Sequence, residues 1–150
     1  MMNNYKTIIL KRGKEDSLLR KHPWIFSGAI HTISDKINEG EVVRVLASNG
    51  NFIAVGHWQI GSIAVRVLSF VDEEINDEFY KKRLATAFDV RKSIGLVRNN
   101  ASTANIINNT FRLIHGEGDN LPGLIIDIYD DTAVMQAHSV GMHCDRSTIA

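Results

Sequence analysis

The sequence contains a single cysteine and no apolar run long enough to cross a membrane. Cys144 alone can form neither an internal disulfide nor a multi-cysteine zinc site, and this scarcity fits a reducing compartment. A membrane-spanning helix needs about 20 consecutive apolar residues, and residues 1–10 also lack the long apolar core of a signal peptide. These absences predict a cytoplasmic protein with no membrane partner and no redox function.

Motifs for catalysis and for cofactor binding are equally scarce. The Gly-x-Gly sequence at 116–118 is not a dinucleotide fingerprint, because Leu121 stands at the third glycine position and no Lys-Ser or Lys-Thr pair follows. His138, His143 and Cys144 are irregularly spaced for a metal site, and the adjacent His143 is poorly placed to activate Cys144 as a nucleophile. We therefore expect no catalytic residue, no metal and no cofactor in this chain.

The composition is that of a folded protein with an uneven charge distribution. The 150 residues are 44% hydrophobic, which suits one ordinary domain or two small ones. Residues 1–71 carry nine Lys or Arg against five Asp or Glu, whereas residues 72–150 carry eight against twelve. The bases near the start indicate a phosphate-facing surface, with a solvated charged face as the alternative. They are Lys6, Lys11, Arg12, Lys14, Arg20 and Lys21.

The first half is rich in β-forming residues and predicts a small β-barrel domain over residues 1–71. The Asn49-Gly50 pair is a strong hairpin signal between two of its strands. His22-Pro23 ends a short helical segment at 15–21, because the residue before a proline is disfavoured in the α region. The predicted strands are residues 5–11, 42–47, 52–58 and 63–70.

The second half predicts a small α/β domain over residues 72–150, so that the whole fold is α+β. A helix capped by Asn76 or Asp77 runs to about residue 94 and ends at Gly95. A polar stretch at 99–109 precedes the strands, and we expect only partial order over residues 141–150. The helix is expected to bury Tyr80, Leu84, Ala87, Phe88 and Ile94, and the predicted strands are residues 110–115, 124–129 and 132–137.

The loop at residues 116–123 combines three glycines, a proline and two carboxylates. Gly116, Gly118 and Gly123 permit backbone conformations that other residues avoid, and Pro122 fixes its own φ. Because functional residues concentrate on loops held by rigid strands, we interpret this loop as the wall of a functional pocket. A purely structural turn is the alternative. The two carboxylates are Glu117 and Asp119.

A second distinctive segment, residues 20–30, mixes basic side chains, two aromatic rings and a glycine. Trp24 and Phe26 are expected in the core, whereas the basic residues and Gly28 are better placed to contact a partner. Structured RNA is recognised through its shape, its phosphates and its 2′-hydroxyls. The segment therefore indicates RNA binding.

Two motifs resemble a known family. Residues 22–30, HPWIFSGAI, resemble the opening of the PUA RNA-binding domain in bacterial large-subunit rRNA cytosine-5 methyltransferases of the RlmI type. Residues 111–127, FRLIHGEGDNLPGLIID, look like the signature of the middle domain of the same family. Both occur in the order of the family with a long helix between them, so the resemblance covers nearly the whole chain.

The resemblance implies a three-part enzyme in which a PUA domain grips ribosomal RNA, a middle domain positions it, and a Rossmann-like domain methylates C5 of a cytosine with S-adenosylmethionine. The cofactor turn and the catalytic thiolate of the third part have no counterpart here, so we expect a truncated and catalytically inert portion. The implied RNA contacts are Lys11, Arg12, Arg20, Lys21, His22 and Gly28. The implied loop facing the catalytic domain or its substrate contains Arg112, Glu117, Asp119 and Pro122.

Two other classes of function stay open at this point. A non-enzymatic RNA-binding adaptor would share the basic first half, and a protein-interaction module would use the acidic second half as its docking surface. The RNA site and the oligomeric state, including a homodimer, are also open.

Overall fold

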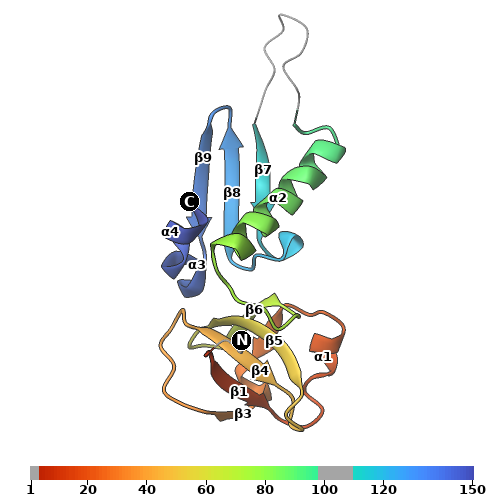
Figure 1. Cartoon of the computed structure of the whole chain (residues 1–150), viewed down its shortest axis with the longest axis vertical. Helices are drawn as coiled ribbons and strands as arrows, with labels where there is room; N and C mark the ends of the chain where they lie inside the picture. Colours follow the sequence, from red (N-terminus) through yellow and green to blue (C-terminus); the bar gives the residue numbers. More distant parts are fainter. Residues whose placement is uncertain (1–3, 98–109) are drawn as a thin grey trace, which may run out of the picture.

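The computed structural model describes residues 4–97 and 110–150, and its fold is mixed α+β, as the sequence predicted. A curled six-stranded sheet forms the N-terminal part, and a long helix with a second, three-stranded sheet forms the C-terminal part (Figure 1). The elements of the N-terminal part are β1 Lys6–Leu10, α1 Asp16–Leu19, β2 Trp24–Phe26, the 3₁₀ turn η1 Ser27–Ala29, β3 Ile30–Ile33, β4 Val42–Leu46, β5 Phe52–Trp58 and β6 Ile63–Ser69.

The first sheet has the strand order β2-β6-β5-β4-β1-β3 and curls into a half-barrel. β1 runs parallel to β4, and every other pair of neighbours is antiparallel. The sheet therefore curls as a barrel does, which confirms that part of the prediction. It does not close, because β2 and β3 are separate edges of the sheet. With three and four residues respectively, these edge strands offer few main-chain groups for pairing.

The predicted hairpin at Asn49-Gly50 joins β4 to β5. The N–H of Gly50 donates to the Ala47 carbonyl at 3.0 Å, and the N–H of Asn51 donates to Oδ1 of Asn49 at 3.0 Å. Gly50 has φ +84° while Asn49 does not have a positive φ. Glycine is needed at this turn because only its backbone enters the left-handed region without steric cost.

The C-terminal part packs one long helix against the second sheet, whose order is β7-β8-β9 (Figure 1). The three strands begin and end where the sequence predicted, whereas the polar stretch at 99–109 lies outside the described residues. The elements are α2 Asp77–Ser93, β7 Thr110–His115, the 3₁₀ helix η2 Gly116–Asp119, β8 Leu124–Tyr129, β9 Thr132–Ala137, α3 Val140–Cys144 and α4 Arg146–Ile149.

The ends of α2 follow the predicted capping residues. Oδ1 of Asn76 accepts a hydrogen bond from the Phe79 N–H at 3.0 Å, which satisfies one free donor of the first turn. At the other end Gly95 has φ +80°, and the Leu96 N–H donates to the Arg91 carbonyl at 2.9 Å. This is the pattern of a Schellman motif.

Two predictions about the C-terminal part are wrong. Phe88 and Ile94 are 41% and 66% exposed, whereas Phe79, which was not predicted, is buried. The start of α2 packs against β6 of the first sheet as well as against the second sheet. The residues that α2 buries therefore do not follow one helical stripe. Residues 141–150 are folded as α3 and α4, since Met142 and Ile149 are buried in the core of this part.

Strand β6 connects the two hydrophobic cores. Val65 and Val67 pack in the core of the first sheet, whereas Leu68 belongs to the core formed by α2 and the second sheet. Side chains of a strand point alternately to its two faces, and both faces are buried here. This explains why apolar and polar residues alternate only approximately along β6. Across the described residues, no helix has both the length and the apolar character that a bilayer crossing requires.

Candidate nucleic-acid interface

A hollow of about 330 Å³ lies between α1 and the β2–η1 segment. Lys14, Trp24, Phe26 and Gly28 are among its lining residues. Nζ of Lys11 donates to the Gly28 carbonyl at 2.9 Å, so the lysine is held beside this hollow. We call the basic and aromatic residues of segments 11–14 and 20–26, together with Gly28, the α1–β2 surface. It comprises Lys11, Arg12, Lys14, Arg20, Lys21, His22, Trp24, Phe26 and Gly28.

All six residues that the sequence suggested for RNA contact are solvent-exposed. Lys21 has φ +65°, a left-handed conformation that places its Nζ 4.6 Å from the centre of the Phe70 ring. A Cβ added to Gly28 would meet nothing within 4 Å, so no packing inside the chain requires glycine there. Exposure makes these residues accessible to a ligand, but their role in RNA contact stays a prediction. They are Lys11, Arg12, Arg20, Lys21, His22 and Gly28.

The aromatic residues of this surface were predicted to be core, and for Phe26 that prediction is wrong. Phe26 is 50% exposed and Trp24 is partly buried. The rings of His22, Trp24 and Phe26 form a cluster with centroids 6.0 to 6.5 Å apart. Phe26 ends a three-residue edge strand, so it has neighbours on fewer sides than a central strand would provide. The only feature of the sequence that pointed to an exposed Phe26 was its position next to Ser27 and Gly28.

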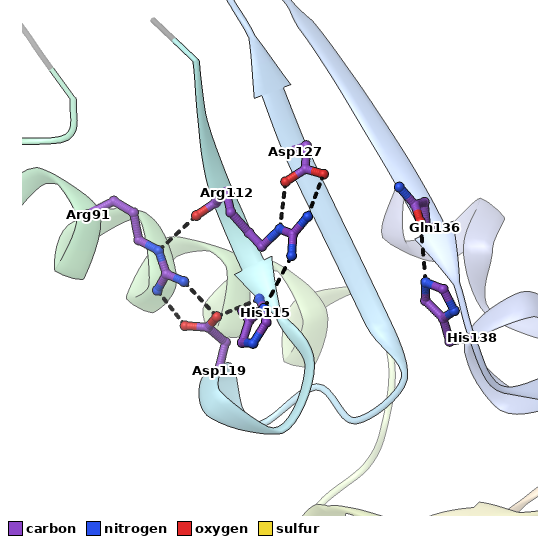
Figure 2. A network of polar contacts seen from close by, with 7 residues as sticks. All are labelled: Arg91, Arg112, His115, Asp119, Asp127, Gln136 and His138. Carbon is purple, nitrogen blue, oxygen red and sulfur yellow. Dashed lines mark hydrogen bonds and ion pairs between the residues drawn. The ribbon is translucent and has the colours of Figure 1, made fainter.

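The Gly-rich loop is stabilised mainly by its own part of the chain (Figure 2). Nη1 and Nη2 of Arg91 on α2 donate to the two carboxylate oxygens of Asp119 at 2.5 and 2.7 Å. The side chains of this pair are 13% and 9% exposed. Asp119 also accepts from the His115 N–H at 2.7 Å, and Nε of Arg91 donates to the Arg112 carbonyl. Asp119 therefore closes the loop onto α2.

Arg112 forms the second ion pair in Figure 2, with Asp127 directly opposite on β8. Nε and Nη2 of Arg112 donate to the carboxylate at 2.7 and 3.1 Å. The hydrogen bond from Arg112 outweighs partial desolvation and lowers the pKa of Asp127. The arginine side chain is 44% exposed, so this pair lies on the uncovered face of the sheet and is accessible to solvent.

Glu117 links the loop to the first sheet. Its Oε1 accepts a hydrogen bond from Nε1 of Trp24 at 3.0 Å. Pro122 of the same loop is buried. The loop thus contacts the α1–β2 surface of the same chain, a relation that the sequence did not suggest. Whether Arg112, Glu117, Asp119 and Pro122 also face a catalytic domain or its substrate stays a prediction.

A partly buried polar cluster was not predicted from the sequence. Nε2 of His57 on β5 lies 2.9 Å from Oδ2 of Asp145, which also accepts from the Tyr80 hydroxyl at 2.5 Å. Burial opposes the charged carboxylate, but hydrogen bonds from His57 and Tyr80 outweigh it and lower the pKa of Asp145. Burial, with the bond to Asp145, raises the pKa of Tyr80. The cluster joins the first sheet, α2 and the C-terminal helices. No local pattern could reveal it, because its members are far apart in sequence.

The histidines and cysteine near the C-terminus do not assemble into a site. In the parts of the chain that the structure describes, no three His, Cys, Asp or Glu side chains are grouped as metal ligands. His138 contacts Gln136 at 3.3 Å (Figure 2), and Cys144 is exposed.

The half-barrel with its basic and aromatic edge lies in the segment that a domain-family model matches. Residues 8–70 match the model of the PUA-like domain family, and this segment contains most of the first sheet and the whole α1–β2 surface. This match agrees with the motif at residues 22–30, which resembles the opening of a PUA domain.

Along nearly its whole length the chain is similar to ribosomal RNA large subunit methyltransferase I. It is 38% identical over 144 residues to the protein of that name from Erwinia tasmaniensis, covering 95% of this chain and 34% of the relative. It is 40% identical over 144 residues to the one from Shewanella amazonensis, with the same coverage. The resemblance found in the two motifs is thus confirmed, and the chain spans about a third of the length of these relatives.

Solved structures share the fold at much lower identity. A protein from Streptococcus mutans described as a SAM-dependent methyltransferase aligns with a TM-score of 0.73 at 18% identity, over 95% of this chain and 35% of that protein. A structure described as a methyltransferase in complex with SAH aligns with a TM-score of 0.74 at 18% identity and the same coverage. The arrangement of both sheets is therefore a recurring one.

Proposed function

We propose that this chain binds ribosomal RNA through the α1–β2 surface, as the RNA-binding part of a methyltransferase that transfers a methyl group from S-adenosylmethionine to C5 of a cytosine. The observation that carries the proposal is the exposed combination of basic side chains and an aromatic cluster on a PUA-like domain. Cations bind phosphates without regard to sequence, and aromatic rings stack on unpaired bases. The relatives are named ribosomal RNA large subunit methyltransferase I, and this name supports the same substrate.

We further propose that residues 1–71 act as the RNA-binding domain and residues 72–150 as a middle domain that positions the substrate. The hydrogen bond between Trp24 and Glu117 supports a defined orientation of the two. The partly buried pair of His57 with Asp145 supports it as well, because it joins the same two parts at another point. A fixed orientation would hold bound RNA in one place relative to the second sheet.

The described residues do not fit a site for S-adenosylmethionine. The glycine-rich segment after β7 forms the four-residue η2 and does not begin a long helix. Its carboxylates, Glu117 and Asp119, are held by Trp24 and Arg91. No methyl-transfer step therefore belongs to these residues. We propose that the cofactor binds in the portion of the related methyltransferases that this chain does not cover, and that the chain alone is inert.

The proposal predicts RNA binding that depends on both salt and the basic residues of the α1–β2 surface. The double variant Arg12→Ala/Arg20→Ala should reduce the slope of log K against log salt by about 1.8, since each lost phosphate contact removes about 0.9. Fluorescence anisotropy with a labelled ribosomal stem-loop RNA measures this slope. Lys36→Ala removes an exposed charge outside the surface and serves as the control. Absence of RNA binding by the unchanged protein at low salt would refute the proposal.

Phe26 is predicted to stack on an RNA base. Replacing it with alanine should weaken RNA binding about tenfold, because a base–aromatic contact contributes roughly 1–3 kcal/mol. The fold should persist, since the side chain is half exposed. Ile60→Ala, which removes another exposed apolar side chain, is the control in the same anisotropy assay. Equal affinities of the two variants would show that Phe26 makes no contact with RNA.

One observation favours protein docking as a second activity of the C-terminal part. On the second sheet Tyr129 and Val134 are 49% and 42% exposed. Apolar side chains exposed together on a sheet often mark an interaction surface. We propose that this face contacts the catalytic part of the methyltransferase.

A further inference from the structure

A cleft of about 450 Å³ lies where the end of β6 meets α2 and the loop after η2. Its volume is within the range of about 300–1,000 Å³ that is typical of small-ligand sites. Side chains from both parts of the chain line it, so it exists only when the first sheet and α2 are together. The lining residues used below are Lys21, Phe70, Glu73, Lys82, Arg83 and Glu117.

Three cationic side chains line this cleft, and one of them has no partner among the described residues. Nη2 of Arg83 donates to the Leu68 carbonyl at 3.1 Å, and its guanidinium lies 5.0 Å from the centre of the Phe79 ring. Lys21 lies over the Phe70 ring. The ammonium of Lys82 is exposed and makes no hydrogen bond or ion pair with any residue in the described ranges 4–97 and 110–150.

The two carboxylates of the cleft are each engaged by a neighbouring group. Glu117 accepts from the Trp24 indole at 3.0 Å, and Oε1 of Glu73 accepts from the Ser69 hydroxyl. Neither is paired with Lys82 or Lys21. Both carboxylates keep their charge, so the cleft carries three cations against two anions, and the two lysines are the groups that an anion can bind.

We propose that this cleft binds one nucleotide of the RNA strand, with its phosphate held by Lys82 and Lys21. The inference rests on the proposed RNA binding and deepens it. Lys21 is shared between the α1–β2 surface and the cleft, so an RNA strand that leaves this surface reaches Lys82 by a continuous path. Phe70 supplies an apolar wall beside the phosphate position. Thus α2 contributes to RNA binding although it lies outside the PUA-like segment at 8–70.

Lys82→Gln tests the proposal, with Lys81→Gln as the matched control. Lys81 is the preceding exposed lysine of α2 and does not line the cleft. The Lys82 variant should bind the stem-loop RNA on the order of fivefold more weakly and lose about 0.9 from the salt slope. The Lys81 variant should retain the original affinity and slope. Equal behaviour of both variants would overturn the cleft assignment.

A second measurement separates this inference from the proposed function. Acetylation of lysines with and without RNA, read by mass spectrometry, should show protection of Lys82 and Lys21 but not of Lys81. If RNA binds and the Arg12/Arg20 variant weakens it while Lys82 stays unprotected, the cleft inference fails and the proposed function stands. If no RNA binds, the proposed function fails first. Uridine monophosphate alone should not protect Lys82 at micromolar concentration, and protection by it would instead indicate a free-nucleotide site.

Discussion

Replacing Asp119 with alanine is expected to lower the free energy of unfolding of the C-terminal part by about 3 kcal/mol. The side chain is 9% exposed, and both its oxygens accept hydrogen bonds from Arg91, itself 13% exposed. Removal of one partner leaves the guanidinium charge buried without compensation, and breaking a buried pair typically costs about 3–5 kcal/mol. The His115 N–H loses its acceptor as well.

Urea unfolding followed by far-UV circular dichroism measures this effect, because α2 is the longest helix of the described residues. Asp127→Ala is the matched control. It removes another carboxylate that accepts two hydrogen bonds from one arginine, but the arginine is 44% exposed, so water can solvate the charge that remains. The control should therefore shift the transition much less than Asp119→Ala. Similar shifts for the two variants would mean that the cost of breaking these ion pairs does not depend on their burial.

Gly141→Ala is expected to destabilise the protein by about 3 kcal/mol. An added Cβ at this position would overlap the ring of His57 and lie 2.5 Å from the His57 Cβ. The histidine is 1% exposed and its Nε2 faces Asp145, so the ring cannot move aside without breaking that contact. Overpacking of this kind usually costs about 1–3 kcal/mol. Alanine is the better helix former by about 1 kcal/mol, so a loss of stability cannot come from helix propensity.

Gly28→Ala provides the control, since a Cβ there meets nothing within 4 Å. Its effect on the free energy of unfolding should be within about 0.5 kcal/mol, which is usual for surface sites. The two tryptophans, Trp24 and Trp58, report by fluorescence on the first sheet during the same urea titration. Gly141→Ala should lower the transition midpoint by this probe also. An unchanged midpoint would show that the contact between Gly141 and His57 does not stabilise the protein.

Much of the local structure could be predicted because it depends on neighbouring residues. The three strands of the second sheet followed from short β-rich runs bounded by turns, and Asn76 and Gly95 marked the ends of α2. The exposure of the basic residues near α1 followed from their charge. The burial of Phe79 and the exposure of Phe26 could not be predicted, because each depends on a neighbouring element far along the chain.

The sequence by itself determined the class of fold, most element boundaries, the family resemblance and the basic character of the α1–β2 surface. Periodicity, capping residues and motifs act over a few residues, so they can be read from the chain. Only the tertiary structure decided what the carboxylates of the Gly-rich loop contact and how the two parts meet. Glu117 meets Trp24 across 93 residues, and His57 meets Asp145 across 88. Such contacts depend on the packing of β6 between two cores, which no short-range pattern records.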